Sequence, residues 1–454
     1  MKIFFLDNLN IVINERKKVM IFFLIFIVLV SAISIVHTFL FIQKNSYLVD
    51  GQLNIIIGRI PFNWGPLIEN IYSNFEFTQF DYNIEFYLKK FPLNALFLAM
   101  ILKVSKNIYF FMLIKNIFSS SLIFYFSYLF SKNNQKTFLF FSFLLLGFFI
   151  IPYNTYVIFN FVYADHLTSF LVPLLFLSLV SKYKKNYYII GTLIFILYFL
   201  KPSMFFICVA MPFFIILLEK EKINYKKFIP FIFLLTAIFS WGTYGLLKTN
   251  HFPFGKNLLS NNSYDFSAIM NKQFIKLYPN IGVDELVHNK TTIDFLKLSN
   301  FNNEWEYYDY FNQKNKIYLK ENLHDYLKTI PKKIYFIFFN VRRDNLRSDY
   351  VKISGNPIRY SNIFNKLSLN TAFIISLFIL IKNFRNILNY KLEVYYLSLL
   401  SLNLLPHIYA WATNKHLVAL YITSNLYLVL KFLNKKKPLI KLHKTTLKFL
   451  SLNN

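Results

Sequence analysis

The stretch FIQKNSYLVDGQLNIIIGRI (residues 41–60) opens a polar segment, which FYLKKFPLNALFLAMILKVSK (residues 86–106) closes. The preceding residues 19–41 are almost wholly apolar and long enough to cross a bilayer, because a membrane helix needs roughly 17–25 residues. Asp50 is therefore expected a few residues beyond a membrane helix, under a loop formed by residues 42–106. A carboxylate held at a membrane surface favours chemistry on a molecule that arrives in the lipid.

The composition indicates an integral membrane protein. Of 454 residues, 56% are hydrophobic and only 16% are charged. Soluble domains are roughly 45–50% apolar with about a quarter charged. The apolar residues come in blocks, which predicts many membrane helices. A single cysteine excludes a disulfide within the chain and a cysteine-based metal site.

The apolar blocks predict an all-α polytopic protein with about ten membrane helices and both termini in the cytoplasm. Arg16, Lys17 and Lys18 flank the first block, and basic flanks stay on the cytoplasmic side. Residues 91–104 are too short for a span and predict an interfacial helix. The predicted spans are residues 19–41, 108–130, 138–151, 167–180, 188–200, 203–218, 228–247, 369–381, 394–412 and 417–432.

The distribution of charge supports this topology. Each predicted cytoplasmic segment carries at least two Lys or Arg, whereas the short outer connections carry one or none. The formal net charge of +28 therefore follows mostly from topology, and we expect no nucleic-acid partner. Membrane lipids are the expected partners of the basic segments.

Three regions follow from the same pattern. Residues 1–247 form an N-terminal membrane module, and residues 367–454 form the last helices with a basic cytoplasmic tail. Between the seventh and eighth helices, residues 248–366 form a long extracytoplasmic region with interfacial helices. Its stretch IYLKENLHDYLKTIPKKIYFIFFN (residues 317–340) predicts an amphipathic helix, a break at Pro331 and an apolar helix.

Ionisable residues gather on the predicted outer side, with few near the bilayer midplane. Transporters tend to keep ionisable residues at the midplane, so the pattern favours chemistry at the interface. Arg342 and Arg343 follow an apolar segment, and guanidinium groups bind phosphate bidentately. The alternative is that they anchor the region to anionic lipid. The chain contains no phosphate-binding glycine loop, no HExxH and no GxSxG, and its eight histidines include no i, i+4 pair.

The sequence carries an ordered series of motifs at Asp50, Lys90, Pro92-Leu93, Asp165, Lys201-Pro202 and Lys415-His416. This series resembles the GT-C superfamily of membrane glycosyltransferases. The resemblance covers residues 1–247 in order and spacing, and the remainder loosely. Gly51 stands where the family often has a second acid, and Asp165 replaces the commoner Glu.

The resemblance implies an inverting transferase that uses a polyprenyl-phosphate-linked sugar. The acceptor would be a glycan, a lipid or a protein at the extracytoplasmic face of the plasma (inner) membrane. Asp50 is the predicted general base, and Asp165 would orient a sugar or share a divalent cation with Asp50. No cofactor or bound metal is required, although a divalent cation is compatible with the site. The predicted ligands of the donor phosphate are Lys201, Arg342, Arg343, Lys415 and His416.

Each of these residues also has a structural interpretation. Asp50 could pair with Arg59 or Lys89, Asp165 could cap a helix, and Lys201 could extend its amine from a helix end to water. Lys415 and His416 could likewise extend from a helix end to water. The functional alternatives are a polymerase or ligase for lipid-linked glycans, a transporter or flippase for such glycans, and a non-catalytic scaffold.

Overall fold

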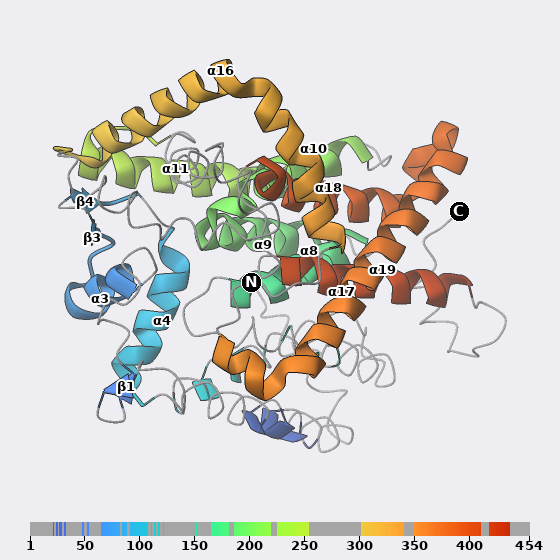
Figure 1. The fold of residues 1–454 in the computed structure, drawn as a ribbon, viewed down its shortest axis with the longest axis horizontal. Helices are drawn as coiled ribbons and strands as arrows, with labels where there is room; N and C mark the ends of the chain where they lie inside the picture. The colour runs from blue at the N-terminus through green and yellow to red at the C-terminus, as the bar shows by residue number, and fades with distance from the viewer. Residues whose placement is uncertain are drawn as a thin grey trace.

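The computed structural model describes residues 65–81, 84–88, 91–107, 165–180, 186–218, 225–253, 301–339, 348–409 and 417–435, with scattered residues in 21–32, 48–53, 110–121 and 147–154. This part of the chain is mostly helical, as predicted (Figure 1). The helices are α3 (Gly65–Asn74), α4 (Pro92–Val104), α8 (Asp165–Val180), α9 (Asn186–Leu200), α10 (Phe205–Leu218), α11 (Ile229–Thr249), α16 (Glu304–Phe339), α17 (Ser348–Lys382), α18 (Lys391–Tyr409) and α19 (Val418–Lys435). Short 3-10 turns are η2 (Pro202–Met204), η3 (Tyr225–Phe228) and η4 (Phe384–Asn389).

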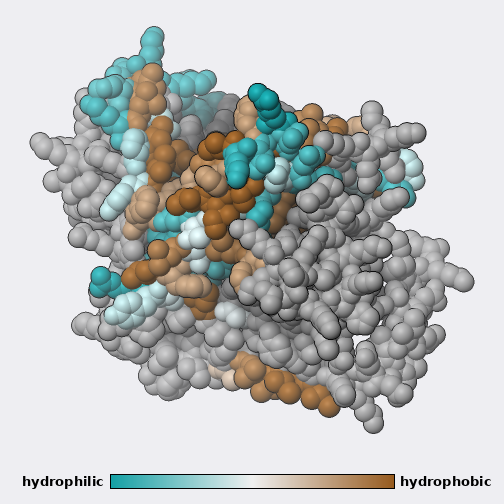
Figure 2. Space-filling view, turned by 90° about the vertical axis from the view of Figure 1, so that its right-hand side faces the viewer, coloured by the Kyte–Doolittle hydropathy of each residue, from teal (hydrophilic) through white to brown (hydrophobic). Residues whose placement is uncertain are grey.

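Two helical segments are long and apolar enough to cross a membrane, Tyr225–Thr249 and Arg359–Lys382. Both expose large apolar side chains, which the core helix of a soluble protein would bury. Apolar surface also lies open between hydrophilic patches on the face shown in Figure 2. These exposures favour a membrane environment for the two segments. The side chains concerned are Ile232, Phe239, Leu247, Ile374, Phe378 and Ile381.

Seven predicted spans correspond to helices α8, α9, α10, α11, α17, α18 and α19, with ends that shift by a few residues in most cases. The exception is α17, which begins at Ser348, well before the predicted start at residue 369. Predicted spans 19–41, 108–130 and 138–151 lie largely outside the described residues. The count of ten therefore stays a prediction.

The predicted break at Pro331 is wrong, because α16 continues through this residue from Glu304 to Phe339. An interior proline removes one backbone hydrogen bond, and a helix can absorb this loss as a bend. Figure 1 shows α16 bent as it runs from β4 towards α18.

Two short antiparallel hairpins interrupt the all-helical pattern that the sequence predicted. In the first, β1 (Leu48–Val49) pairs with β2 (Gln52–Leu53). In the second, β3 (Gln79–Asp81) pairs with β4 (Ile84–Phe86) and sets Gln79 opposite Phe86. Residues directly opposite in an antiparallel pair lie on the same face, so Gln79 and Phe86 share one face of this hairpin.

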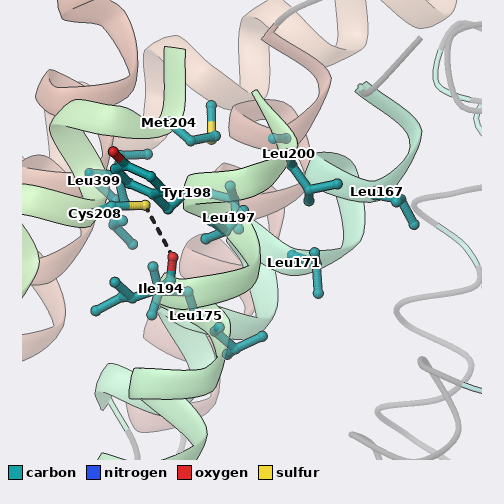
Figure 3. Close-up of a cluster of buried hydrophobic side chains, with 14 of the residues drawn as sticks. Leu167, Leu171, Leu175, Ile194, Leu197, Tyr198, Leu200, Met204, Cys208 and Leu399 are labelled. Atoms are coloured by element: carbon teal, nitrogen blue, oxygen red, sulfur yellow. Dashed lines mark hydrogen bonds between the residues drawn. The ribbon is translucent and has the colours of Figure 1, made fainter. Parts of the chain in front are cut away.

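Helix α9 occupies the middle of the packed helices, in contact with α4, α8, α10 and α11. Figure 3 shows leucines of α8 and α9 meeting along their length, Leu171 near Leu197 and Leu167 near Leu200. The order of these pairs shows that α8 and α9 run antiparallel. Cys208 of α10 is fully buried against α9, and its thiol donates to the Ile194 carbonyl (3.4 Å).

Candidate functional site

The antiparallel packing of α8 and α9 brings two of the predicted site residues to one end of the helix pair. Asp165 is the first residue of α8, and Lys201 directly follows α9. The neighbour of Asp165, His166, is buried and stacks on Phe97 of α4 with ring centroids 6.5 Å apart. The predicted residues Asp50, Arg342, Arg343, Lys415 and His416 lie outside the described residues.

Aromatic side chains join the start of α4 to this same end of α9. The ring of Phe91, which is 2% exposed, lies 5.2 Å from Tyr198 and 5.2 Å from Trp241 of α11. Trp241 stacks on Tyr244 at 5.3 Å, and the Tyr244 hydroxyl donates to the Phe77 carbonyl (3.0 Å). The segment before β3 is thereby fastened to α11.

The start of α16 is fixed by asparagine capping. The Asn303 side-chain oxygen accepts from the backbone N–H groups of Trp305 and Glu306, both at 3.0 Å. The Glu306 carboxylate accepts in turn from the N–H of Asn302 (2.9 Å). Reciprocal bonds of this kind start a helix at a defined residue. They place Glu304 in the first turn of α16.

Glu304 is a carboxyl group that the sequence analysis did not single out. It is 2% exposed, and its Oε2 accepts from the N–H groups of Tyr87 (3.2 Å) and Leu88 (3.1 Å), which follow β4. The hydroxyl of Tyr308 donates to the same oxygen (3.2 Å). The other oxygen, Oε1, is buried and has no hydrogen-bond partner among the described residues.

Burial raises the pKa of Glu304 to about 7 from its ordinary value of 4.5. The three hydrogen bonds oppose this shift because they stabilise the charged form, and the nearby Glu85 adds to it. Near neutral pH the group is therefore divided between its protonated and ionised forms. Perturbed carboxyl groups of this kind are common at functional sites.

Aromatic rings lie around the start of α16, and the hairpin that binds Glu304 carries a second buried polar group. Phe86 packs edge-on against Tyr307 at 5.2 Å, and Trp305 packs edge-on against His251 at 4.7 Å. Gln79, on the same face of the hairpin as Phe86, is 1% exposed. Neither atom of its side-chain amide has a hydrogen-bond partner in the part of the chain that the structure describes.

At the more exposed side of the hairpin, Tyr87 donates a hydrogen bond to Glu85 (2.7 Å). Burial, followed by this hydrogen bond, raises the pKa of Tyr87 to about 12. The ammonium group of Lys248, in the last turn of α11, lies 5.8 Å from the Tyr87 ring centroid. Figure 1 shows β4, the end of α11 and the start of α16 together at the left of the molecule.

The turn after α11 positions His251. Asn250 adopts a left-handed conformation (φ 56°), and its N–H caps the last turn of α11 (2.9 Å). A Cβ on Gly245 would lie 2.6 Å from Pro253 Cδ and 3.2 Å from the His251 carbonyl oxygen.

We expect Gly245→Ala to displace this turn and to lower the free energy of unfolding by about 1–3 kcal/mol in detergent. Gly147→Ala, where a Cβ meets nothing within 4 Å, is the control and should cost nothing.

This arrangement can bind an uncharged polar group. The Glu304 carboxylate oxygen and the Gln79 amide, both buried without partners among the described residues, could accept from and donate to hydroxyl groups. Among the described residues, no group of three His, Cys, Asp or Glu side chains could hold a metal ion.

Two signals in the sequence could have indicated this site: the capping pattern at Asn303–Glu306 and the strand alternation before Tyr87.

A second set of buried polar groups runs along α18 and α19. Glu393, which is 2% exposed, pairs with Lys431 at one end. Further along, the Tyr396 hydroxyl bonds the Ser424 hydroxyl (2.9 Å), and Asn403 is fully buried.

Comparisons of the chain with models of known protein families, with curated proteins and with solved structures found no match.

Proposed function

We propose that the protein is an integral membrane glycosyltransferase that moves a sugar from a polyprenyl-phosphate carrier to an envelope acceptor at the extracytoplasmic face. The observation that carries the proposal is Glu304, a buried carboxyl group with one unpartnered oxygen among the described residues, set among aromatic rings. Such a group suits the hydroxyls of a sugar. Two helices long and apolar enough to cross a membrane support the membrane setting.

The proposed reaction is a single displacement. An acceptor oxygen or nitrogen bonds to the anomeric carbon, the bond from that carbon to the phosphate oxygen breaks, and polyprenyl phosphate leaves. The proton of the acceptor passes to Asp50, and attack opposite the leaving group inverts the anomeric centre. Asp165 and Glu304 would hold sugar hydroxyls. The negative charge on the leaving phosphate would be stabilised by fixed cations. These are Lys201, Arg342, Arg343, Lys415 and His416.

Replacement of Asp50 by asparagine tests this function. Mass spectrometry of envelope glycans from cells with and without the gene would first identify the product. We expect Asp50→Asn to reduce that product at least 100-fold at a normal protein level, because general base catalysis contributes about 10²–10⁴-fold. Asp309→Asn, at an exposed position on α16, should leave the product unchanged.

Two results would contradict the proposal at different levels. A full yield of product from Asp50→Asn would remove Asp50 from the mechanism. An unchanged set of envelope glycans after loss of the gene would contradict the transferase itself. A product lengthened by whole glycan units, in place of a single sugar, would instead indicate a polymerase or ligase.

The buried polar groups of α18 and α19 favour a second candidate, a transporter or flippase for lipid-linked glycans. Buried polar and ionised groups inside membrane helices often mark a path for a polar solute. Proteoliposomes carrying a lipid-linked sugar in one leaflet distinguish the two candidates. A transporter would expose the sugar to reagents on the other side without forming a glycosidic bond, whereas a transferase would form that bond.

A further inference from the structure

Helix α18 contacts η2, and each of these two elements carries a buried polar group. Asn403 is 0% exposed, and neither its Oδ1 nor its Nδ2 has a hydrogen-bond partner among the described residues. The hydroxyl oxygen of Ser203, in η2, is also buried without a partner in the same part of the chain. By contrast, the buried amide of Asn425 in α19 is paired and donates to the Tyr421 carbonyl (3.0 Å).

The packing of α18 indicates that these two groups lie near each other. Helix α18 contacts both α10 and η2. Leu399 lies beside Cys208 of α10 in Figure 3. Asn403 comes one helical turn after Leu399 and so lies on the same side of α18. Tyr396 of α18 contacts Phe176, which lies eleven residues beyond Asp165 along α8 and so far from η2. Leu399 lies beside Cys208, closer to η2. Helix α18 therefore runs towards η2, and Asn403 lies on the η2 side of Leu399.

The residues around this point suit an anion. Lys201 directly precedes η2, and α10 begins at Phe205, so the positive end of the α10 helix dipole lies at this end. Helix N-termini, ammonium groups, hydroxyls and amide N–H groups are the donors that bind phosphate in proteins. An amide and a hydroxyl that are buried without partners destabilise a folded chain, which favours a bound group that pairs with them.

We propose that Lys201, Ser203 and Asn403 bind the phosphate group of the lipid-linked donor. The choice of ligand rests on the proposed function, while the position of the site rests on the unpartnered amide and hydroxyl. Ser203 and Asn403 thereby add two uncharged donors to the basic residues already considered. The site lies at the end of α9 that also carries the contact between Phe91 and Tyr198.

The test is binding of farnesyl phosphate, with farnesol as the uncharged probe, to the full chain in lipid nanodiscs. We expect Asn403→Leu and Ser203→Ala each to weaken binding of farnesyl phosphate about tenfold, the effect of losing one hydrogen bond to a charged group. Binding of farnesol should not change. Asn425→Leu and Ser424→Ala are matched controls, because the side chains they replace are already paired within α19, and they should bind both probes as the wild type does.

Thermal unfolding separates this site from a packing role. Asn403→Leu should melt at or above the wild-type temperature because it removes an unpaired buried amide, whereas Asn425→Leu should melt below it because it removes a paired one. Wild-type affinity for farnesyl phosphate in Asn403→Leu would overturn the site. Equal affinity of the wild type for both probes would overturn the phosphate ligand, and with it the proposed function. Asp50→Asn should bind farnesyl phosphate normally, which separates binding from transfer.

Discussion

Glu304→Gln is expected to lower kcat/KM for sugar transfer about 10–100-fold and to leave the chain folded. The amide oxygen of glutamine can accept the same three hydrogen bonds from Tyr87, Leu88 and Tyr308. What the variant loses is the charge of the unpartnered oxygen. A hydrogen bond to a charged group contributes about 1.5–3 kcal/mol, which corresponds to the stated range. Because Glu304 is proposed to hold a hydroxyl, the change should be mainly in KM, whereas Asp50→Asn should lower kcat.

The pH profile gives this prediction a second readout. The pKa of Glu304 is raised to about 7, so its ionised form, the stronger acceptor, increases as pH rises through 7. The wild-type kcat/KM should therefore rise across pH 6–8. The corresponding rise should be absent in Glu304→Gln. The measurement is initial transfer rates in membranes at several donor concentrations and pH values.

Stability should change with pH in the opposite direction. A carboxyl group with a raised pKa favours the folded state while it is protonated. Its contribution is complete below the unfolded pKa of about 4.5 and is lost as pH rises through about 7. The rise of the pKa from 4.5 to about 7 limits this loss to about 3 kcal/mol. Glu304→Gln should lose less stability than the wild type between pH 5 and pH 8 in detergent.

Glu306→Gln is the matched control for these measurements. Glu306 lies two residues further along α16, where its exposed carboxylate bonds Asn302. Its replacement should leave kcat/KM and the pH rise unchanged. Retention of the wild-type KM and pH rise by Glu304→Gln would mean that Glu304 only fastens α16 to the hairpin.

The sequence predicted the helices of the bundle well and the Glu304 site poorly, for a physical reason. Blocks of apolar residues determine where a helix can be buried or meet lipid, and α8, α9 and α11 follow these blocks closely. Glu304 depends instead on a contact between residues more than 200 positions apart, at Leu88 and α16. Local patterns at Asn303–Glu306 and before Tyr87 mark the two elements, but they do not specify that these elements meet. The hairpin at residues 79–86 was missed because its strands have only three residues each.

Pro331 illustrates how packing overrides a local signal. Proline disfavours a helix interior, and the polar-to-apolar change near residue 331 strengthened the prediction of a break. The part of α16 that follows this proline is nevertheless held by contacts. The Lys333 amine donates to the Ile408 carbonyl of α18 (3.1 Å), and the Lys366 amine of α17 donates to the Ile337 carbonyl (2.9 Å). Burial also lowers the pKa of Lys333 to about 8. These contacts fix the direction of α16 after the bend.

The buried ion pair between Glu393 and Lys431 supports the prediction with the largest expected effect on stability. Lys431→Leu should lower the free energy of unfolding by about 3–5 kcal/mol, because it leaves a charge buried without its partner. The side chain of Glu393 is 2% exposed and that of Lys431 is 21% exposed. Glu393→Leu should therefore cost less than Lys431→Leu, since the remaining ammonium group can reach water.

The double variant tests whether the pair itself stabilises the fold. Two leucines at these positions remove both charges and keep apolar volume between α18 and α19, so most of the stability lost in Lys431→Leu should return. Lys382→Leu, at an exposed end of α17, is the control and should change stability by less than about 0.5 kcal/mol. The free energies follow from reversible unfolding in mixed detergent micelles. If the double variant is as unstable as Lys431→Leu, the loss comes from poor packing of leucine and the charge of Glu393 is not its cause.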